Sequence, residues 1–220
     1  MVNPRDDADA GLLLLFIRLY SRVMHRVRYE GLANVRAVEQ RRPMIVIANH
    51  TAGVDPLLIQ NATRVFEPRW MMAADMRVPQ LEPFWRWTRI IDVDRYESDA
   101  RSARVAMAHL KQGGVLGIFP EGGIERPSRS LLPFLPGVGL LIKRSGATVL
   151  PVIIEGTPQV DPAFAALWHR SRSVVRFMEP IGYADRGLSA SAIVADLQAR
   201  YEAWTGWPVN THRSDGVGAG

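Results

Sequence analysis

Past residue 30 the chain alternates short runs of apolar residues with longer stretches in which apolar positions recur at helical spacing. The short runs are rich in branched and large apolar side chains, a pattern that is typical of buried strands. We expect strands at residues 44–48, 70–74, 115–119, 148–154 and 174–178.

The stretches between these runs predict helices. Pro56 follows Asp55, so Asp55 is the expected N-cap and Pro56 the first residue of a helix. In the stretch 98–112, Val105 and Leu110 would lie on one side of a helix, and the Gly-Gly pair at residues 113–114 would end it. We expect helices at residues 56–65, 98–112, 137–145 and 189–204.

Strands that alternate with helices predict an α/β protein with a mixed, mostly parallel central sheet flanked by helices. The 220 residues fit one domain with a substantial core, and no internal stretch has the composition of a linker. We therefore expect a tail and helix at residues 1–30, one domain at 31–208, and a disordered polar tail at 209–220.

The helix expected within residues 1–30 combines leucines with arginines. Its uncharged run is too short to span a bilayer, and no small-residue cleavage site of a signal peptide follows it. Arg18, Arg22 and Arg26 recur every four residues, as in a basic amphipathic helix that lies in a membrane interface. An ordinary surface helix that packs its leucines on the domain is the alternative, and the pattern leaves both open.

The amino-acid composition excludes several kinds of site and partner. Cysteine is absent, which excludes disulfides, thiolate metal sites and a cysteine nucleophile. Only two of the 27 basic residues are lysines, and arginine suits phosphate and carboxylate partners. Arginine codon usage or an anionic partner would each explain this excess. The arginines are scattered without a nucleic-acid-binding signature, so no nucleic-acid partner is expected.

The histidines other than His50 lie in unrelated sequence contexts, so no metal site is expected. His25 and His169 are expected at the surface.

The segment "ANHTAGVDPLL" places His50 and Asp55 on either side of four small or apolar residues. A strand ending near residue 49 delivers His50 to the carboxyl edge of the sheet, where open α/β folds bind ligands. Asp55 near the imidazole would make a general base with an orienting acid. Neither a cysteine nor a Gly-x-Ser-x-Gly elbow is present, which leaves the attacking hydroxyl to the substrate. A helix-capping Asp55 beside a loop histidine is the alternative reading of the same spacing.

A second constellation, "GVLGIFPEGGIERP", follows the strand expected at 115–119. Its glycines would let backbone N–H groups approach an anion or a developing oxyanion. Glu121 can accept hydrogen bonds from a polyol, and Arg126 can pair with a phosphate. An ordinary Gly-Gly turn with flanking charges would look the same.

Together with "RIIDVDR" and "TVLPV", these segments closely resemble, in order, the motifs of the glycerolipid acyltransferase family, which includes the 1-acylglycerol-3-phosphate acyltransferases. The family's Asn-His followed after four residues by Asp matches His50 and Asp55. Its second motif ends in an arginine, here Arg95, and its third is Phe-Pro-Glu-Gly, here residues 119–122. The fourth is a Val/Leu-Pro-Val strand, here residues 150–152, and the resemblance covers about residues 30–180.

The resemblance implies transfer of a fatty acyl group from a thioester, on coenzyme A or acyl carrier protein, to a hydroxyl of a lysophospholipid. His50 would deprotonate that hydroxyl and Asp55 would orient His50. The substrate-binding residues implied or expected are Arg95, Glu121, Gly122, Gly123 and Arg126. No bound cofactor is implied, since the thioester is a substrate.

Two departures from the family pattern concern the acceptor. Ile124 stands where the family usually has arginine, and Leu135 where lysine is common. Both remove positive charge near the presumed headgroup site, so a 1-acylglycerol-3-phosphate-like acceptor and other hydroxyl acceptors, such as a lyso-ornithine lipid, stay open. A non-catalytic lipid-binding protein on the same fold is the further alternative. Lipid substrates imply a peripheral location at the cytoplasmic face of the cell membrane.

Overall fold

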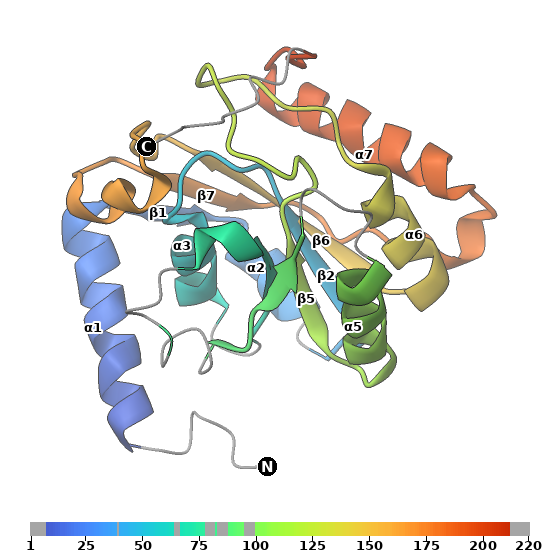
Figure 1. Ribbon diagram of the computed structural model, residues 1–220, viewed down its shortest axis with the longest axis horizontal. Helices are drawn as coiled ribbons and strands as arrows, with labels where there is room; N and C mark the ends of the chain where they lie inside the picture. Colours follow the sequence, from blue (N-terminus) through green and yellow to red (C-terminus); the bar gives the residue numbers. More distant parts are fainter. Residues whose placement is uncertain are drawn as a thin grey trace.

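The computed structural model describes residues 8–38, 40–63, 67–77, 82, 88–94 and 100–211, and the side chains among these from residue 15 onward. A central sheet carries helices on both faces (Figure 1). The helices are α1 Ala8–Met24, α2 Leu32–Ala37, α3 Asp55–Ala62, α5 Ala100–Lys111, α6 Pro136–Ser145 and α7 Ala190–Thr205, with the 3-10 helices η1 Ala74–Met76, η3 Ala163–Trp168 and η4 Ala184–Arg186. The strands are β1 Arg28–Glu30, β2 Met44–Ala48, β3 Arg69–Ala73, β4 Ile91–Val93, β5 Val115–Ile118, β6 Thr148–Glu155 and β7 Val174–Phe177.

The sheet has the strand order β1-β7-β6-β2-β5-β3-β4. β6, β2, β5, β3 and β4 pair in parallel, whereas β7 runs antiparallel to β6 and pairs in parallel with β1. The expected mixed, mostly parallel sheet flanked by helices is therefore confirmed.

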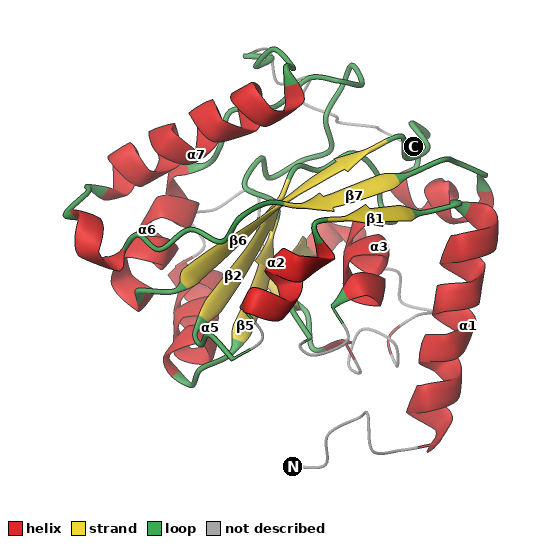
Figure 2. Ribbon diagram, turned by 180° about the vertical axis from the view of Figure 1, so that it is seen from behind, coloured by secondary structure: helices red, strands yellow, loops and turns green. Residues whose placement is uncertain are grey.

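Strand β2 shows why the central strands are continuous apolar runs. All five of its residues are fully buried. Ile45 and Ile47 pack with α5, α6 and α7 on one face, and Met44, Val46 and Ala48 pack with α2 and α3 on the other. Figure 2 shows α5, α6 and α7 gathered at one side of the sheet. A strand covered on both faces loses the alternation of apolar and polar residues.

The C-terminal helix reaches into the middle of this sheet. Tyr201 of α7 is fully buried, and its hydroxyl donates to the carbonyl of Ile47 at 2.7 Å and accepts the N–H of Val152 at 3.2 Å. The hydroxyl thus joins backbone groups near the end of β2 and near the middle of β6.

The expected strands agree with the observed ones to within a residue at each end. β1, β4 and α2 were not expected, because three to six residues are too short to establish a period. Two details of the helices were wrong. Val54 precedes the first helical residue, so Asp55 is not the N-cap of α3. In α5 the buried positions are Ser102, Ala106 and Leu110, while Val105 lies beside that stripe and is exposed.

The amphipathic N-terminal helix is present as α1, but its faces differ from the expected ones. Arg18 is half-buried and its charge acts on Tyr29, and Arg26 lies beyond the end of the helix. The three arginines therefore do not form one exposed stripe. Leu15 and Leu19 are exposed, so they do not pack on the domain. No helix in the described part of the chain is long and apolar enough to cross a membrane.

Ordered structure continues slightly past the expected domain end at residue 208. Val209 forms a bridge with Leu131, and the N–H of Asn210 donates to the Leu131 carbonyl at 2.7 Å. The rest of the expected tail, from residue 212, lies outside the described residues.

Candidate active site

Three loops meet at one edge of the sheet, after strands β6, β2 and β5. These strands are neighbours and run parallel, so their carboxyl ends lie side by side. The loop after β2 carries His50, the loop after β5 carries Glu121 to Arg126, and the loop after β6 carries Thr157 to Asp161.

His50 and Asp55 form a hydrogen-bonded pair. The Nδ1 of His50 lies 2.9 Å from the Oδ2 of Asp55, whose side chain is 0% exposed, while that of His50 is 19% exposed. A carboxylate can only accept, so Nδ1 carries the proton and Nε2 keeps its lone pair. The pair therefore has the tautomer that a general base requires.

The Asp55 carboxylate also organises the loop that precedes it. It accepts the backbone N–H groups of Thr51 and Ala52 at 2.6 and 2.9 Å, and the hydroxyl of Thr51 at 3.0 Å. These donors lie upstream of the helix, so Asp55 does not cap α3 as the simpler interpretation of the spacing required. Its oxygens are fixed before any substrate is bound.

The imidazole of His50 lies at the end of an aromatic stack. Its ring is 4.0 Å from that of Phe119 at an angle of 15°, and Phe119 lies 5.1 Å from the ring of Trp70 at the same angle. Gly117 makes room for the indole, because a β-carbon at residue 117 would lie 2.5 Å from it. The stack fixes the plane of the His50 imidazole. The sequence did not indicate Trp70 as part of the site, because Trp70 lies on a separate strand.

The backbone of His50 is held from three sides. Asn49 exchanges two hydrogen bonds with the backbone of Ile154, at 2.9 and 2.8 Å. The N–H of His50 donates to Oε1 of Glu121 at 2.9 Å, and the N–H of Glu125 donates to the His50 carbonyl at 2.8 Å. The loops after β2 and β5 and strand β6 are therefore joined around His50.

Glu121 has a different position from the one that the sequence predicts. Its side chain is 0% exposed, and its second oxygen accepts the N–H of Leu132 at 2.7 Å. Burial, with a smaller contribution from the charge of Asp55, raises the pKa of Glu121 to about 8 despite these donors. The carboxyl group braces the backbone of the site, and no part of it reaches the surface to contact an acceptor.

Gly122 and Gly123 follow Glu121 in the chain and are the part of this loop that is accessible to solvent. Gly122 has a φ of 66°, a conformation that glycine adopts without strain, and its N–H donates to the carbonyl of Phe119 at 3.1 Å. Both glycines stay at least partly exposed, so the prediction that they line a substrate site is compatible with their position.

Arg126 contacts the third loop. Its guanidinium donates to Oε1 of Gln159 at 3.0 Å and to Oδ1 of Asp161 at 3.2 Å. Gln159 in turn donates to the carbonyl of Thr51 at 2.9 Å, and the hydroxyls of Thr51 and Thr157 lie 2.6 Å apart. A phosphate at Arg126 would compete with these partners. Thr157 and Gln159 were missed, although their place just after a buried parallel strand was a usable signal.

Glu125 is a third buried carboxyl group at this site, after Asp55 and Glu121. It is 1% exposed, and one oxygen accepts the N–H of Arg129 at 3.3 Å, while the other has no hydrogen-bond partner among the described residues. Burial, followed by the charge of Glu121, raises the pKa of Glu125 to about 8.

A family model described as Acyltransferase matches residues 26–155, which is more than half of the chain and includes the loops after β2 and β5. The chain belongs to the acyltransferase family. This acyltransferase is 28% identical over 135 residues to N-acylphosphatidylethanolamine synthase from Arabidopsis thaliana. That match covers 54% of the chain and 46% of the relative, so the chain spans about half the length of the curated relative.

A solved structure has the same fold as this acyltransferase. The 1-acyl-sn-glycerophosphate (LPA) acyltransferase PlsC from Thermotoga maritima matches with a TM-score of 0.66 at 22% sequence identity. The match covers 94% of this chain and 84% of that one. The α/β fold expected from the alternation of strands and helices thus has a counterpart among solved structures.

The predictions for Arg95, His25 and His169 have different outcomes. Arg95 lies outside the described residues, so its predicted contact with the acceptor phosphate stays a prediction. His25 was expected at the surface but is fully buried, and its nitrogens lie 2.9 Å from Ser171 Oγ and 3.2 Å from the Tyr20 hydroxyl. His169 is exposed, as expected. Within the described ranges, no three residues of metal-ligating type come together.

Proposed function

We propose that this acyltransferase moves a fatty acyl group from an acyl thioester to a hydroxyl of a lysophospholipid, with His50 as the general base. The observation that supports this proposal most directly is the 2.9 Å contact between His50 Nδ1 and the buried carboxylate of Asp55. A base oriented in this way, in a sequence with neither a cysteine nor a Gly-x-Ser-x-Gly elbow, suits attack by a substrate hydroxyl.

The proposed chemistry follows from the exposed nitrogen of His50. Nε2 accepts the proton of the acceptor hydroxyl while the hydroxyl oxygen attacks the thioester carbonyl. When the tetrahedral intermediate collapses, the carbon–sulfur bond breaks and the imidazolium returns the proton to the departing thiolate. Asp55 stabilises the imidazolium between these steps, as a buried carboxylate does in hydrolase triads.

The acceptor that we propose first is 1-acylglycerol-3-phosphate-like. It rests on the motifs and on the fold shared with the Thermotoga maritima enzyme, whose name includes that acceptor class. The surroundings of His50 favour testing less anionic acceptors as well. Ile124 stands where the family usually has arginine, and Arg126 is engaged by Gln159 and Asp161. A lyso-ornithine lipid is the alternative hydroxyl acceptor, and the Arabidopsis relative's name adds phosphatidylethanolamine to the panel.

Purified protein should be assayed with acyl-coenzyme A and acyl carrier protein donors against this panel of acceptors, with wild type, His50→Ala and the exposed-histidine control His169→Ala. We expect His50→Ala to lower turnover by about 10²–10⁴-fold, which is the usual contribution of a positioned base, and His169→Ala to match the wild type. His169→Ala should unfold at the wild-type temperature within about 2 °C. His50→Ala should lose some stability, since it lacks the Nδ1 contact with buried Asp55 and the stack on Phe119, so circular dichroism should first show that this variant is folded at the assay temperature. Undiminished turnover in His50→Ala contradicts the mechanism, and binding without turnover by the wild type favours a lipid-binding protein.

We propose that the protein binds peripherally at the cytoplasmic face of the cell membrane, where acyl thioesters and lysolipids meet. No bound cofactor enters the proposed reaction, because the thioester supplies both the acyl group and the leaving group. After cell lysis the protein should sediment with membranes and be released by alkaline carbonate. A protein that stays wholly in the supernatant at low salt would contradict the peripheral location.

A further inference from the structure

The loop that follows β6 holds Thr51 at two points. The side-chain amide of Gln159 donates to the Thr51 carbonyl at 2.9 Å, and the hydroxyls of Thr157 and Thr51 lie 2.6 Å apart. Thr51 follows His50 directly in the chain and is 2% exposed. The residue next to the base is therefore fixed by a segment that lies more than 100 residues later in the sequence.

The contact between the two threonines leads to the carboxylate that orients the base. The Thr51 hydroxyl lies 3.0 Å from Oδ1 of Asp55, and a carboxylate accepts hydrogen bonds without donating any. Thr51 therefore gives its hydroxyl proton to Asp55, and Thr157 is the donor in the contact between the hydroxyls. The other oxygen of Asp55 accepts the Nδ1 proton of His50 at 2.9 Å. The hydrogen bonds thus run in one direction from the loop after β6 to the His50–Asp55 pair.

Gln159 joins Thr51 to a guanidinium group. Its amide has a single possible orientation, because Arg126 offers donors alone and the Thr51 carbonyl can only accept. Oε1 of Gln159 therefore faces Arg126 at 3.0 Å, and Nε2 faces Thr51 at 2.9 Å. Displacement of Arg126 would release the amide that holds Thr51.

The guanidinium of Arg126 is itself occupied by this loop. One terminal nitrogen donates to the carbonyl of Glu125 at 2.8 Å as well as to Gln159. The other donates to the carbonyl of Val160 at 3.4 Å and to Oδ1 of Asp161 at 3.2 Å. Each of these nitrogens carries two protons, so these bonds use the protons of both. Arg126 thus joins the loop after β5 to the loop after β6.

The hydrogen bonds of Gln159 should matter more for the catalytic rate than for stability. Gln159 is exposed, so water can replace its partners and each bond adds little to the free energy of unfolding. A displacement of about 1 Å in a catalytic group can cost about 10²-fold in rate, even when the substitution lies away from the chemistry. Thr51 donates twice to Asp55, so a shift of Thr51 would be passed directly to the catalytic pair.

We propose that Arg126, Thr157 and Gln159 are positioning residues, which act through Thr51 on the catalytic pair. This inference deepens the proposed function and rests on it, because it takes the histidine of the pair as the base. It assigns Arg126 a task other than the phosphate contact. It also adds to the site two residues of a loop that the four sequence motifs do not include.

The test compares substitutions that change the hydrogen bonds and keep the size of the side chain. Gln159→Glu keeps an oxygen for Arg126 but places a second oxygen against the Thr51 carbonyl, so it breaks the bond to Thr51 alone. Thr157→Val removes the hydroxyl and keeps the shape of the side chain. Arg126→Gln removes the support of the Gln159 amide.

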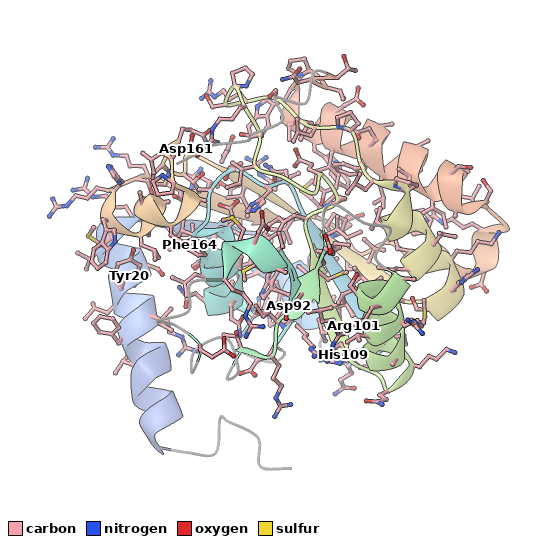
Figure 3. All side chains as sticks on the ribbon, viewed as in Figure 1. Tyr20, Asp92, Arg101, His109, Asp161 and Phe164 are labelled. Carbon is pink, nitrogen blue, oxygen red and sulfur yellow. The ribbon has the colours of Figure 1, made fainter. Side chains whose placement is uncertain are left out.

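The matched controls make the same exchanges at exposed residues far from this loop. Arg101→Gln lies in α5, and Gln112→Glu lies just after that helix. Figure 3 shows Asp161, at the end of the loop after β6, in the upper part of the view and Arg101 in the lower part. Both controls should match the wild type in turnover and in unfolding temperature.

We expect Gln159→Glu to lower kcat by about tenfold to hundredfold, measured with acyl-coenzyme A and the acceptor panel above. Thr157→Val and Arg126→Gln should lower kcat by roughly threefold or more. The fall should be equal for neutral and anionic acceptors, with each acceptor KM within about twofold of the wild type. Unfolding temperatures should stay within about 3 °C of the wild type. A merely structural role would lower the unfolding temperature and leave kcat of the folded protein unchanged.

A second measurement needs no substrate. The ¹⁵N chemical shifts of an imidazole report which of its nitrogens carries the proton. In the wild type, at a pH where the ring is neutral, the proton of His50 should lie on Nδ1, because Asp55 accepts it. Gln159→Glu should give a mixture of the two tautomers, and Gln112→Glu should keep the wild-type shifts.

The two measurements separate failure of this inference from failure of the proposed function. An unchanged tautomer in Gln159→Glu, or a KM effect confined to one acceptor, overturns the positioning role. So does an Arg126→Gln variant that raises KM for phosphate-bearing acceptors alone, which would make Arg126 a headgroup ligand. A mixed tautomer with no acyl transfer by the wild type supports the positioning role and contradicts the proposed function. A mixed tautomer with undiminished turnover also supports positioning of the ring, and contradicts His50 as the base.

Discussion

At the scale of single residues, the site depends on two buried carboxyl groups with different tasks. Asp55 accepts from the imidazole of His50 and from the loop that carries it, whereas Glu121 accepts from the backbone of that same histidine. The first orients the reacting ring and the second holds its backbone. Their substitution should therefore have different effects on catalysis and on stability.

Asp55→Asn should lower turnover by about 10²–10⁴-fold while the acceptor KM changes little. An amide at this position can offer a donor to Nδ1, which selects the wrong tautomer of the ring and removes the charge that stabilises the imidazolium. The measurement is kcat and KM beside the exposed control Asp185→Asn, which should behave as wild type. A KM effect with normal kcat would show that Asp55 serves substrate binding instead.

Glu121→Gln should destabilise the fold by about 1–3 kcal/mol and lower kcat as well. Glutamine can accept only one of the two backbone N–H groups, from His50 and Leu132, and its own amide then faces the other. Urea unfolding checks the stability, with the exposed Glu202→Gln as control. If Glu121 instead contacts the acceptor, the variant will raise KM and leave the free energy of unfolding unchanged.

At the scale of elements, close approaches between strand-end loops and their neighbours decide the shape of the site. Gly53→Ala should weaken both folding and turnover, because its β-carbon meets a backbone oxygen of η3 that cannot rotate away. Gly137→Ala in α6, where a β-carbon meets nothing within 4 Å, should stabilise by up to about 1 kcal/mol with normal turnover. The unfolding temperature and kcat of both variants test this difference. The same unfolding temperature and kcat in Gly53→Ala and Gly137→Ala would contradict the tight contact between residue 53 and η3.

The elements also show which parts of the structure the sequence could predict. Long apolar runs such as residues 44–48 and 148–154 predicted their strands, and the motif spacing brought His50, Asp55 and Glu121 to one edge. The direction of Glu121, inward to the backbone, depends on the Leu132 segment eleven residues away, and no local pattern encodes it. The partners of Arg126 lie more than thirty residues downstream, so its pairing depends on the tertiary fold.

At the scale of the whole molecule, the buried carboxyl groups make stability depend on pH. Burial raises the pKa of Glu121 and of Glu125 to about 8, so between an unfolded value near 4.5 and that pH the folded state keeps protons that the unfolded state has lost. Stability should therefore fall as pH rises to 8. His25 and His109, whose pKa values burial lowers, act in the opposite direction only up to about pH 7.5, where the imidazoles of the unfolded state have lost nearly all their protons.

Glu125→Gln should flatten this dependence. Each retained proton contributes a slope of up to about 1.4 kcal/mol per pH unit, and the variant removes one such proton. Urea unfolding of wild type and variant between pH 6.5 and pH 8.5 measures the two slopes, with Glu202→Gln as the control that keeps the wild-type slope. Equal slopes for Glu125→Gln and wild type would show that Glu125 titrates normally in the folded protein.

The strand order has a consequence for the protein as it leaves the ribosome. Among the described strands β1 comes first in the sequence, but its neighbour in the sheet is β7, about 145 residues later in the chain. The hydroxyl that joins β2 to β6 belongs to Tyr201, later still. A nascent chain arrested before α7 thus has the loops after β2, β5 and β6 but lacks the Tyr201 hydroxyl that joins β2 to β6. Acyl transfer should therefore begin only after α7 has been synthesised and has packed on the sheet.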